Sequence, residues 1–139
     1  MKYSKLLIPL LAITASGIIQ AEVKVVAHPS MSSANAPAAA ISKIFLGKDK
    51  ALEGTRVIPL DQDEGEAPRD EFYTKIANKN ASQLKAYWSR LIFTGKGQPP
   101  KAVLDDDEVI ELVAANPNMI GYVSGDADTS TVKVLLSVP

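Results

Sequence analysis

The sequence contains no cysteine and only one histidine, His28, among its 139 residues. The lack of cysteine excludes disulfide bonds, and the usual zinc sites built from cysteine and histidine are not available. No serine or cysteine near His28 in the sequence forms a recognisable nucleophilic motif, so His28 is interpreted as a turn residue after a strand. A triad assembled from residues distant in sequence is the alternative. We therefore expect a protein that is not an enzyme and that carries no cofactor and no metal.

The sequence also has little excess charge of either sign. Its 15 lysine and arginine residues face 16 aspartate and glutamate residues, which gives a formal net charge of −1. General nucleic-acid binding depends on neutralising phosphates with basic side chains, so this balance argues against it. The balance leaves room for a small-anion site, because backbone N–H groups at a helix start and one arginine suffice.

A long hydrophobic run is missing as well. The longest apolar stretch, Leu6–Ile19, is shorter than the roughly 20 residues that a membrane-spanning helix needs. Lys2 and Lys5 give this stretch a basic start, which is the layout of a secretory signal peptide. We assign residues 1–21 to such a peptide.

Ala21 offers a small residue at the expected cleavage position, and cleavage after Gly17 is the alternative. No cysteine follows the apolar stretch, which excludes a lipoprotein anchor. Export of a chain without cysteine is compatible with the bacterial periplasm. We expect a periplasmic protein with one domain, residues 22–139, whose oligomeric state the sequence leaves open.

Beyond residue 21, stretches rich in β-branched residues alternate with stretches of helical periodicity. The expected strands are Glu22–Ala27, Thr55–Leu60, Lys101–Leu104, Met119–Val123 and Val132–Val138. The expected helices start at Pro37, Pro68, Asn80 or Ser82, and Asp105. This alternation predicts an α/β fold, a mixed sheet flanked by about four helices. Pro59 predicts that the second strand lies at an edge or ends there.

The most regular of these helices lies between Asn80 and Pro100. Its apolar stripe at helical spacing consists of Leu84, Tyr87, Trp88, Leu91 and Ile92. Either Asn80 or Ser82 caps its start, and Gly95 supplies the left-handed residue that ends it. Because Trp88 is the only tryptophan and lies in the middle of the stripe, we expect this helix to be a central packing element.

Two acidic clusters invite comparison with metal sites. The stretch Asp61–Glu66 has the composition of a calcium loop, but its Gly65 comes one position too early, and Phe72 stands where the calcium pattern needs a glutamate. Asp105–Asp107 stand at a helix start, where carboxylates complement the positive helix end. The first cluster is interpreted as a solvated loop and the second as a helix cap.

The best candidate for a binding site is the stretch Gly65–Arg69, GEAPR, which leaves a strand and enters a helix. Free N–H groups at a helix start attract anions, and the guanidinium of Arg69 adds further donors. The neighbouring acidic residues oppose an anion, so an anion site and a structural loop both stay open. Gly95-Lys96-Gly97 lacks the P-loop pattern and is interpreted as a helix-ending turn.

An ordered series of short motifs resembles the substrate-binding proteins of phosphate ABC transporters, which have the type 2 periplasmic binding protein fold. The matching residues are Ile44-Phe45-Leu46-Gly47-Lys48, Val57-Ile58-Pro59-Leu60-Asp61-Gln62, Arg69, Phe72, Tyr87-Trp88-Ser89-Arg90, Phe93-Thr94-Gly95-Lys96-Gly97, Pro99-Pro100 and Ile120-Gly121-Tyr122-Val123. They run through nearly all of the chain beyond residue 21 in a consistent order.

The resemblance implies one lobe of a protein that usually has two lobes closing on the ligand. It implies a site formed by Gln62, Gly65, Glu66 and Arg69 that binds phosphate or another small anion, with an ABC transporter permease or another envelope protein as partner. The family grips phosphate partly with a Ser-Gly-Thr turn, and the corresponding turn here reads Glu64-Gly65-Glu66. A carboxylate facing phosphate costs Coulomb energy. An envelope interaction module that keeps the lobe and has lost the phosphate site is therefore the alternative.

Overall fold

The structure is a computed structural model that describes residues 21–139. The predicted signal peptide, residues 1–21, lies outside the described residues except for Ala21. Within the described range, no helix has both the length and the apolar character that crossing a membrane requires.

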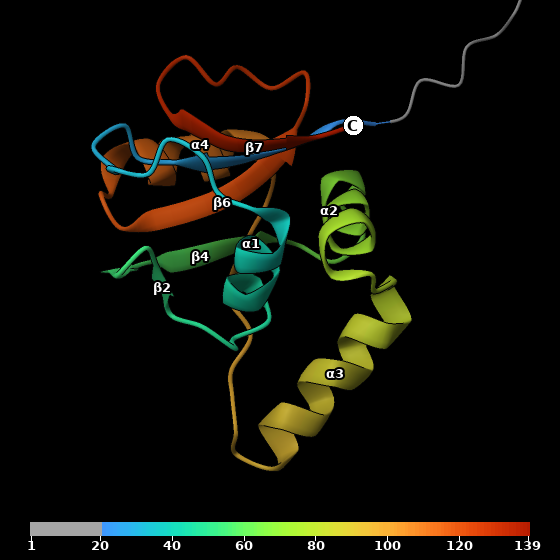
Figure 1. Cartoon of the computed structure of the whole chain (residues 1–139). Coiled ribbons are helices and arrows are strands. Elements are labelled where there is room, and N and C mark those ends of the chain that lie inside the picture. The colour runs from blue at the N-terminus through green and yellow to red at the C-terminus, as the bar shows by residue number, and fades with distance from the viewer. Residues whose placement is uncertain (1–20) are drawn as a thin grey trace, which may run out of the picture.

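Five strands form the main sheet in the order β5-β4-β6-β1-β7 (Figure 1). Their bounds are Val23–Ala27 for β1, Ile58–Gln62 for β4, Lys101–Val103 for β5, Met119–Ser124 for β6 and Lys133–Val138 for β7. Strand β4 runs parallel to β5 and β6, whereas β1 is antiparallel to β6 and β7. The carboxyl ends of β4, β5 and β6 therefore meet at one edge of the sheet.

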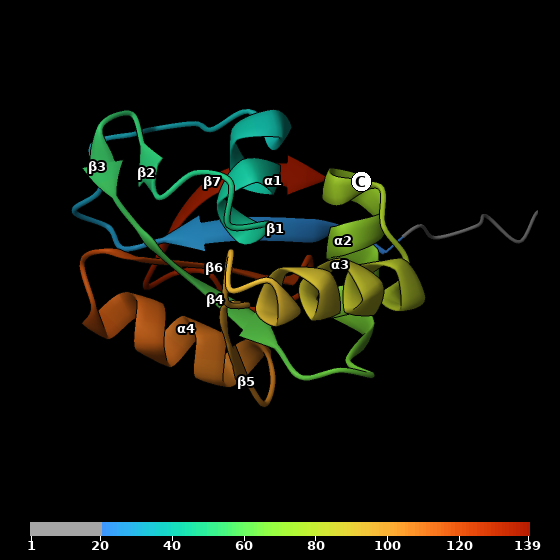
Figure 2. The same ribbon diagram turned by 90° about the horizontal axis from the view of Figure 1, so that it is seen from below.

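Helices cover both faces of this sheet, as Figure 2 shows. Helices α1 (Ala38–Phe45) and α2 (Ala67–Ala77) lie on one face, and α4 (Asp106–Ala115) lies on the other. Helix α3 (Ala81–Phe93) follows α2, and the two-residue strands β2 (Ala51–Leu52) and β3 (Thr55–Arg56) form a separate hairpin. The predicted mixed sheet flanked by four helices is confirmed.

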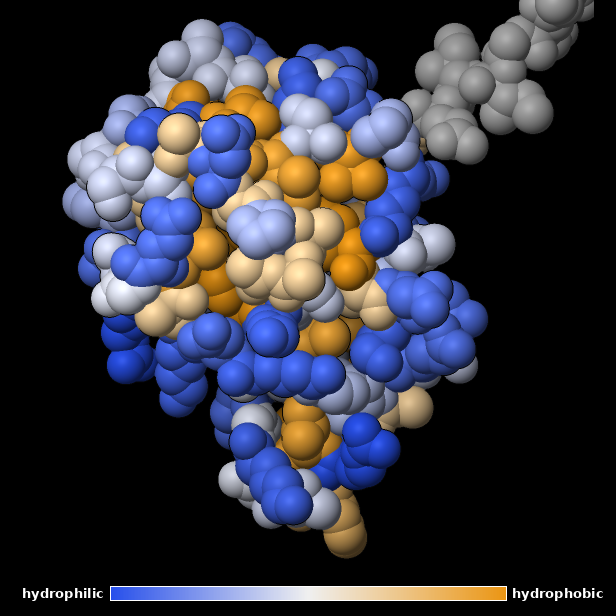
Figure 3. Space-filling model, viewed as in Figure 1, coloured by the Kyte–Doolittle hydropathy of each residue, from blue (hydrophilic) through white to orange (hydrophobic). Residues whose placement is uncertain are grey.

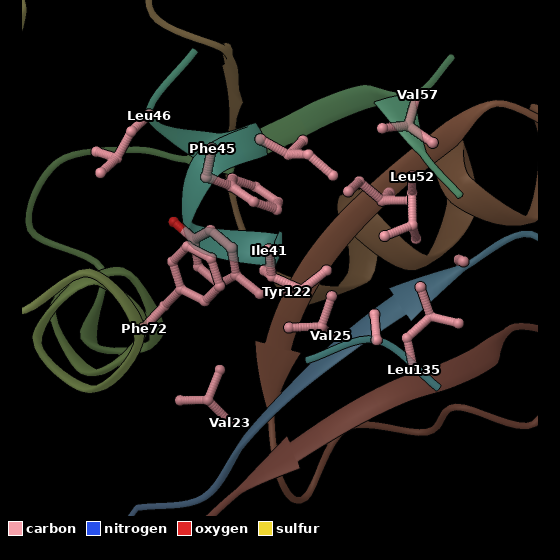
Figure 4. Close-up of a cluster of buried hydrophobic side chains, with 14 of the residues drawn as sticks. Val23, Val25, Ile41, Phe45, Leu46, Leu52, Val57, Phe72, Tyr122 and Leu135 are labelled. Atoms are coloured by element: carbon pink, nitrogen blue, oxygen red, sulfur yellow. The ribbon is translucent and has the colours of Figure 1, made fainter. Parts of the chain in front are cut away.

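Alternation along β1 divides the core between the two faces. Val25 packs into the cluster under α1 and α2, and the next residue, Val26, packs into the cluster under α4. This is the period-two pattern of a strand buried on both sides. In the first cluster the rings of Phe72 and Tyr122 stack with centroids 4.1 Å apart, and the ring of Phe45 meets Phe72 edge-on at 4.7 Å (Figure 4).

The helices begin and end near the predicted capping residues, and the structure decides between the two predicted caps of α3. Asn80, not Ser82, caps α3, and it does so in a capping box with Gln83: each side chain accepts a hydrogen bond from the backbone N–H of the other, at 2.9 and 3.0 Å. Pro37 lies one residue before the first turn of α1. Gly95 has a φ of +69°, the left-handed conformation expected after the helix.

The predicted second strand, Thr55–Leu60, is wrong in its bounds. The structure divides this stretch between β3 and β4, with Val57 between them. Pro59 also lies in an interior strand rather than at an edge. It is tolerated there because Pro59 pairs only with Ile120 of β6, whereas pairing with β5 begins at Leu60.

The expectation that the Trp88 helix is a central packing element is confirmed only in part: Leu84 and Trp88 belong to the main core cluster, and Tyr87 and Leu91 pack against it. Only Leu84 and Trp88 of α3 are buried, and Ile92 at the end of the stripe is 49% exposed. Figure 1 shows α3 projecting from the body of the domain. The amphipathic stripe is longer than the surface that α3 covers, so the core centres instead on β1, β6 and the aromatic rings of α1 and α2.

Gly121 tests the packing of α4 on the sheet. A Cβ atom at this position of β6 would lie 2.5 Å from Cγ1 of Val109 on α4. We expect Gly121→Ala to lower the free energy of unfolding by about 1–3 kcal/mol, the cost of overpacking a filled core. Urea denaturation measures this difference.

Gly97→Ala is the matched control, because a Cβ there would meet its nearest neighbour at 3.7 Å, an ordinary contact. Equal effects of the two substitutions would show that the close contact between β6 and α4 does not govern stability.

Candidate ligand-binding crevice

A crevice of about 530 Å³ opens at the edge where β4 and β6 end and where α2 and α4 begin. Gln62 at the end of β4 and Ser124 at the end of β6 contribute to its wall. The remaining lining residues come from the start of β1, the first turns of the two helices and the loop after β6: Ala21, Glu22, Val23, Glu66, Ala67, Pro68, Glu71, Asp105, Asp106, Asp107 and Asp126. In open α/β sheets this edge is the usual place for a ligand.

Gln62 fixes the floor of the crevice. Its side chain is fully buried, and Nε2 donates hydrogen bonds to Oδ1 of Asp106 at 2.8 Å and to the backbone carbonyl of Tyr122 at 2.9 Å. Its Oε1 has no hydrogen-bond partner among residues 21–139. Both bonds of Nε2 hold the end of β4 against the end of β6 and the start of α4.

Asp106 joins the same three elements from the other side. Its carboxylate accepts hydrogen bonds from the backbone N–H of Ser124 at 3.2 Å and from the Ser124 hydroxyl. The preceding residue, Asp105, caps α4 by accepting a hydrogen bond from the backbone N–H of Glu108 at 3.0 Å. The predicted cap at Asp105–Asp107 is confirmed, and its carboxylates also line the crevice.

The crevice is lined by acceptors. Seven of its lining residues are aspartate or glutamate, and none of the described lining residues is lysine or arginine. Glu71 is paired with Lys75 at 3.1 Å, which removes part of its negative charge. No group of three or more histidine, cysteine, aspartate or glutamate side chains within residues 21–139 is arranged to hold a metal ion.

Arg69 faces away from this crevice. Its guanidinium forms an ion pair with Oδ2 of Asp61 at 3.0 Å and donates a hydrogen bond to the backbone carbonyl of Gln62 at 2.8 Å. Arg69 lines a separate cavity of about 360 Å³ together with Asp61 and Trp88. The structure thus brings Gln62 and Glu66 together in the crevice and places Arg69 behind them.

Gly65 and Glu66 form the turn that leads from β4 into α2. Gly65 has a φ of +97°, a conformation that a side chain disfavours. Glu66 is the N-cap residue of α2, and its side chain makes no capping hydrogen bond, so its carboxylate is available to the crevice.

Asp61 is the residue whose importance sequence analysis missed. The acidic loop predicted it to be solvated, yet Asp61 is only 2% exposed. Its carboxylate accepts hydrogen bonds from the hydroxyl of Tyr73 at 2.7 Å, from the hydroxyl of Tyr122 and from the backbone N–H of Gln62 at 2.8 Å. The one available signal was its position directly after the buried residue Leu60 in a strand.

The ionisation of this cluster follows from its burial. Burial raises the pKa of the Asp61 carboxyl, and the hydrogen bond from Tyr122, the charge of Arg69 and the hydrogen bond from Tyr73 oppose that rise. Burial and the adjacent Asp61 charge raise the pKa values of Tyr73 and Tyr122. Both phenols therefore stay protonated and act as donors.

The mixed sheet and its flanking helices have the fold found in substrate-binding proteins of phosphate ABC transporters. An ABC-type phosphate transport receptor from Vibrio cholerae superposes with a TM-score of 0.64 at 14% sequence identity, and PstS from Borrelia burgdorferi with 0.64 at 15%. A protein from Clostridium perfringens, described as a phosphate ABC transporter substrate-binding protein and solved with bound phosphate, gives 0.62 at 18%. The predicted type 2 periplasmic binding protein lobe is confirmed at the level of the fold.

The match covers 83% of this chain but only 44–46% of these three proteins, so the chain spans less than half of their length. No family model matches the sequence, and no curated protein matches it. The likeness is therefore one of architecture.

Arg69→Met tests the buried ion pair. Because Asp61 would keep its position without its cation, we expect the free energy of unfolding to fall by about 3–5 kcal/mol. Chemical denaturation at neutral pH measures the loss. Lys75→Met, which breaks the more exposed pair with Glu71, is the control and should cost about 1 kcal/mol or less. Similar losses in both variants would contradict a special role for Asp61.

The raised pKa of Asp61 predicts a pH dependence of stability. The folded state then holds a proton that the unfolded state, with a pKa near 3.8, has released. Stability contributed by this group is therefore present below that value and declines as the pH rises through the folded-state pKa. We expect Asp61→Asn to remove this decline, so the stability difference between the two proteins changes across mildly acidic pH. A constant difference would show that Asp61 titrates normally.

Proposed function

We propose that this chain is a solute-binding domain of the bacterial cell envelope, exported by residues 1–21 and acting in the periplasm. The crevice at the carboxyl ends of β4 and β6 is its binding site. One observation carries the proposal: the cavity lies where two helices begin beside parallel strand ends, the arrangement that serves ligands in α/β sheets. The fold shared with phosphate-binding proteins supports it.

The ligand in this proposal is phosphate or a similar small anion that carries its own hydrogen-bond donors. A fully deprotonated anion would meet carboxylates that only accept hydrogen bonds, with Coulomb repulsion added. A protonated phosphate oxygen donates a hydrogen bond, so it can pair with a carboxylate such as that of Glu66. Sulfate has no such proton at neutral pH. The crevice would thus distinguish the two anions by their protonation.

The four predicted site residues then have different roles. Gln62 presents its carboxamide at the floor, Glu66 accepts from the ligand, and Gly65 allows the turn that brings Glu66 there. Arg69 is a positioning residue that holds the Gln62 carbonyl from behind. An ABC transporter permease or another envelope protein is the proposed macromolecular partner.

A thermal-shift titration of residues 22–139 with phosphate and with sulfate at equal ionic strength tests the proposal. Phosphate at 100 times its dissociation constant should stabilise the domain by ~2.7 kcal/mol, which raises the melting temperature by several degrees. The shift should be larger at mildly acidic than at mildly alkaline pH, because more of the phosphate then carries the proton that donates to a carboxylate. Sulfate should give no shift.

Glu66→Gln gives the sharper comparison, because the amide both accepts and donates hydrogen bonds. We expect this variant to bind sulfate better and to lose discrimination against it. A phosphate shift that Glu66→Gln leaves unchanged would remove Glu66 from the site. The absence of a shift with any anion would favour the alternative, an envelope interaction module without a solute site.

A further inference from the structure

The end of α3 exposes two adjacent apolar side chains that the fold does not use. Phe93, the last residue of the helix, is 92% exposed, and Ile92 is 49% exposed. Figure 1 shows this end of α3 at the tip of the molecule, far from the sheet. In Figure 3 the same tip carries hydrophobic surface among hydrophilic residues.

Basic side chains gather beside Ile92. A cavity of about 470 Å³ between the ends of α1 and α3 includes Ile92 in its wall and is lined by Lys48, Lys50 and Lys96. Among its described lining residues there is no aspartate or glutamate. All three lysines are exposed, so their charges are presented to the surroundings.

A neighbouring cavity is also lined by more basic than acidic side chains. It has a volume of about 260 Å³, shares Lys50 with the first cavity and adds Arg56 and Lys101. Asp49 is the one carboxylate among its described lining residues. The α3 tip is defined here as Ile92 and Phe93 together with Lys48, Lys50 and Lys96. Its charged residues are all basic, although the chain as a whole carries a formal net charge of −1.

We propose that the α3 tip docks on the surface of an anionic lipid membrane. An aromatic side chain inserted at the level of the headgroups, with lysines around it, is the pattern of peripheral membrane attachment. Each lysine near an anionic lipid surface contributes about as much as a fivefold gain in affinity. Insertion of Phe93 removes an apolar side chain from water, and Lys48, Lys50 and Lys96 pair with lipid phosphates.

Charge and composition favour a lipid surface over a protein. Lysine is depleted in protein–protein interfaces, and their hot spots are aromatic residues enclosed in packed pockets. Phe93 is instead 92% exposed, and the exposed Lys96 follows it three residues later at the same end of α3. The contact uses none of the crevice residues, so it goes beyond the proposed solute-binding function and leaves the crevice open to solvent.

Co-sedimentation of residues 21–139 with phospholipid vesicles tests this docking surface. That range contains every helix and strand of the fold and omits the apolar stretch Leu6–Ile19, which would itself bind lipid. We expect the protein to sediment with vesicles containing phosphatidylglycerol, to stay in solution with phosphatidylcholine alone, and to be released by salt.

Two variants locate the contact. Phe93→Ala should weaken binding to the vesicles roughly tenfold, because it removes the one aromatic side chain inserted into the interface. Lys96→Ala should weaken binding about fivefold, because it removes one positive charge. Leu104→Ala is the matched control, because Leu104 is 67% exposed but lies outside the α3 tip. All three should melt at the temperature of the unmodified protein.

Three outcomes would overturn the proposal. They are failure of the unmodified protein to sediment with phosphatidylglycerol vesicles, binding of Phe93→Ala as strong as that of the unmodified protein, and a loss of binding in Leu104→Ala as large as that in Phe93→Ala. Binding to an acidic protein surface without binding to vesicles would assign the tip to a protein partner instead and would also contradict the proposal.

Discussion

The placement of α2 on the sheet depends on the hydrogen bonds and the ion pair of the buried Asp61 carboxylate. A charge in a protein interior is costly unless it is paired and hydrogen-bonded, and here four groups satisfy it. The hydroxyl of Tyr122 comes from β6, the hydroxyl of Tyr73 and the guanidinium of Arg69 come from α2, and the backbone N–H of Gln62 comes from β4. Because these four donors come from α2 and from two strands of the sheet, the carboxylate fixes α2 against the sheet in one orientation.

Gln62, the next residue of β4, positions α4 on the opposite face of the sheet. Gln62 is held by Asp106 at the start of α4 and by the backbone of β6, so two successive residues of one strand position the first turns of both helices. The crevice between these turns is thus determined by a rigid, buried network rather than by loops. Such a network gives a binding site its geometry before any ligand arrives, which lowers the ordering cost of binding.

Most helices and strands could be predicted from the sequence because caps and turns depend on residues close together in the chain. Burial could not be predicted where it depends on contacts between residues far apart in the chain. The capping box at Asn80, the left-handed Gly95 and the acidic start of α4 act within a few residues, so their signals are visible in the sequence. The burial of Asp61 depends on Tyr122, which is distant in the chain, and the one local feature that separates Asp61 from the acidic residues after it is its position directly after Leu60. The periodicity of α3 predicted a buried face, but it could not show how little of the domain lies beneath that face.

The carboxylates in the crevice limit how far the shared fold can be used to infer an anionic ligand. Helix starts supply positive potential, and aspartate and glutamate side chains at the starts of α2 and α4 offset it at close range. Charge alone is therefore a poor basis for selection at the proposed site, whereas a hydrogen-bond donor on the ligand can pair with a carboxylate such as that of Glu66, which makes no capping hydrogen bond. Under the proposed function, the crevice would respond to the protonation state of its ligand. The architecture that the chain shares with phosphate-binding proteins does not by itself carry over their way of holding an anion.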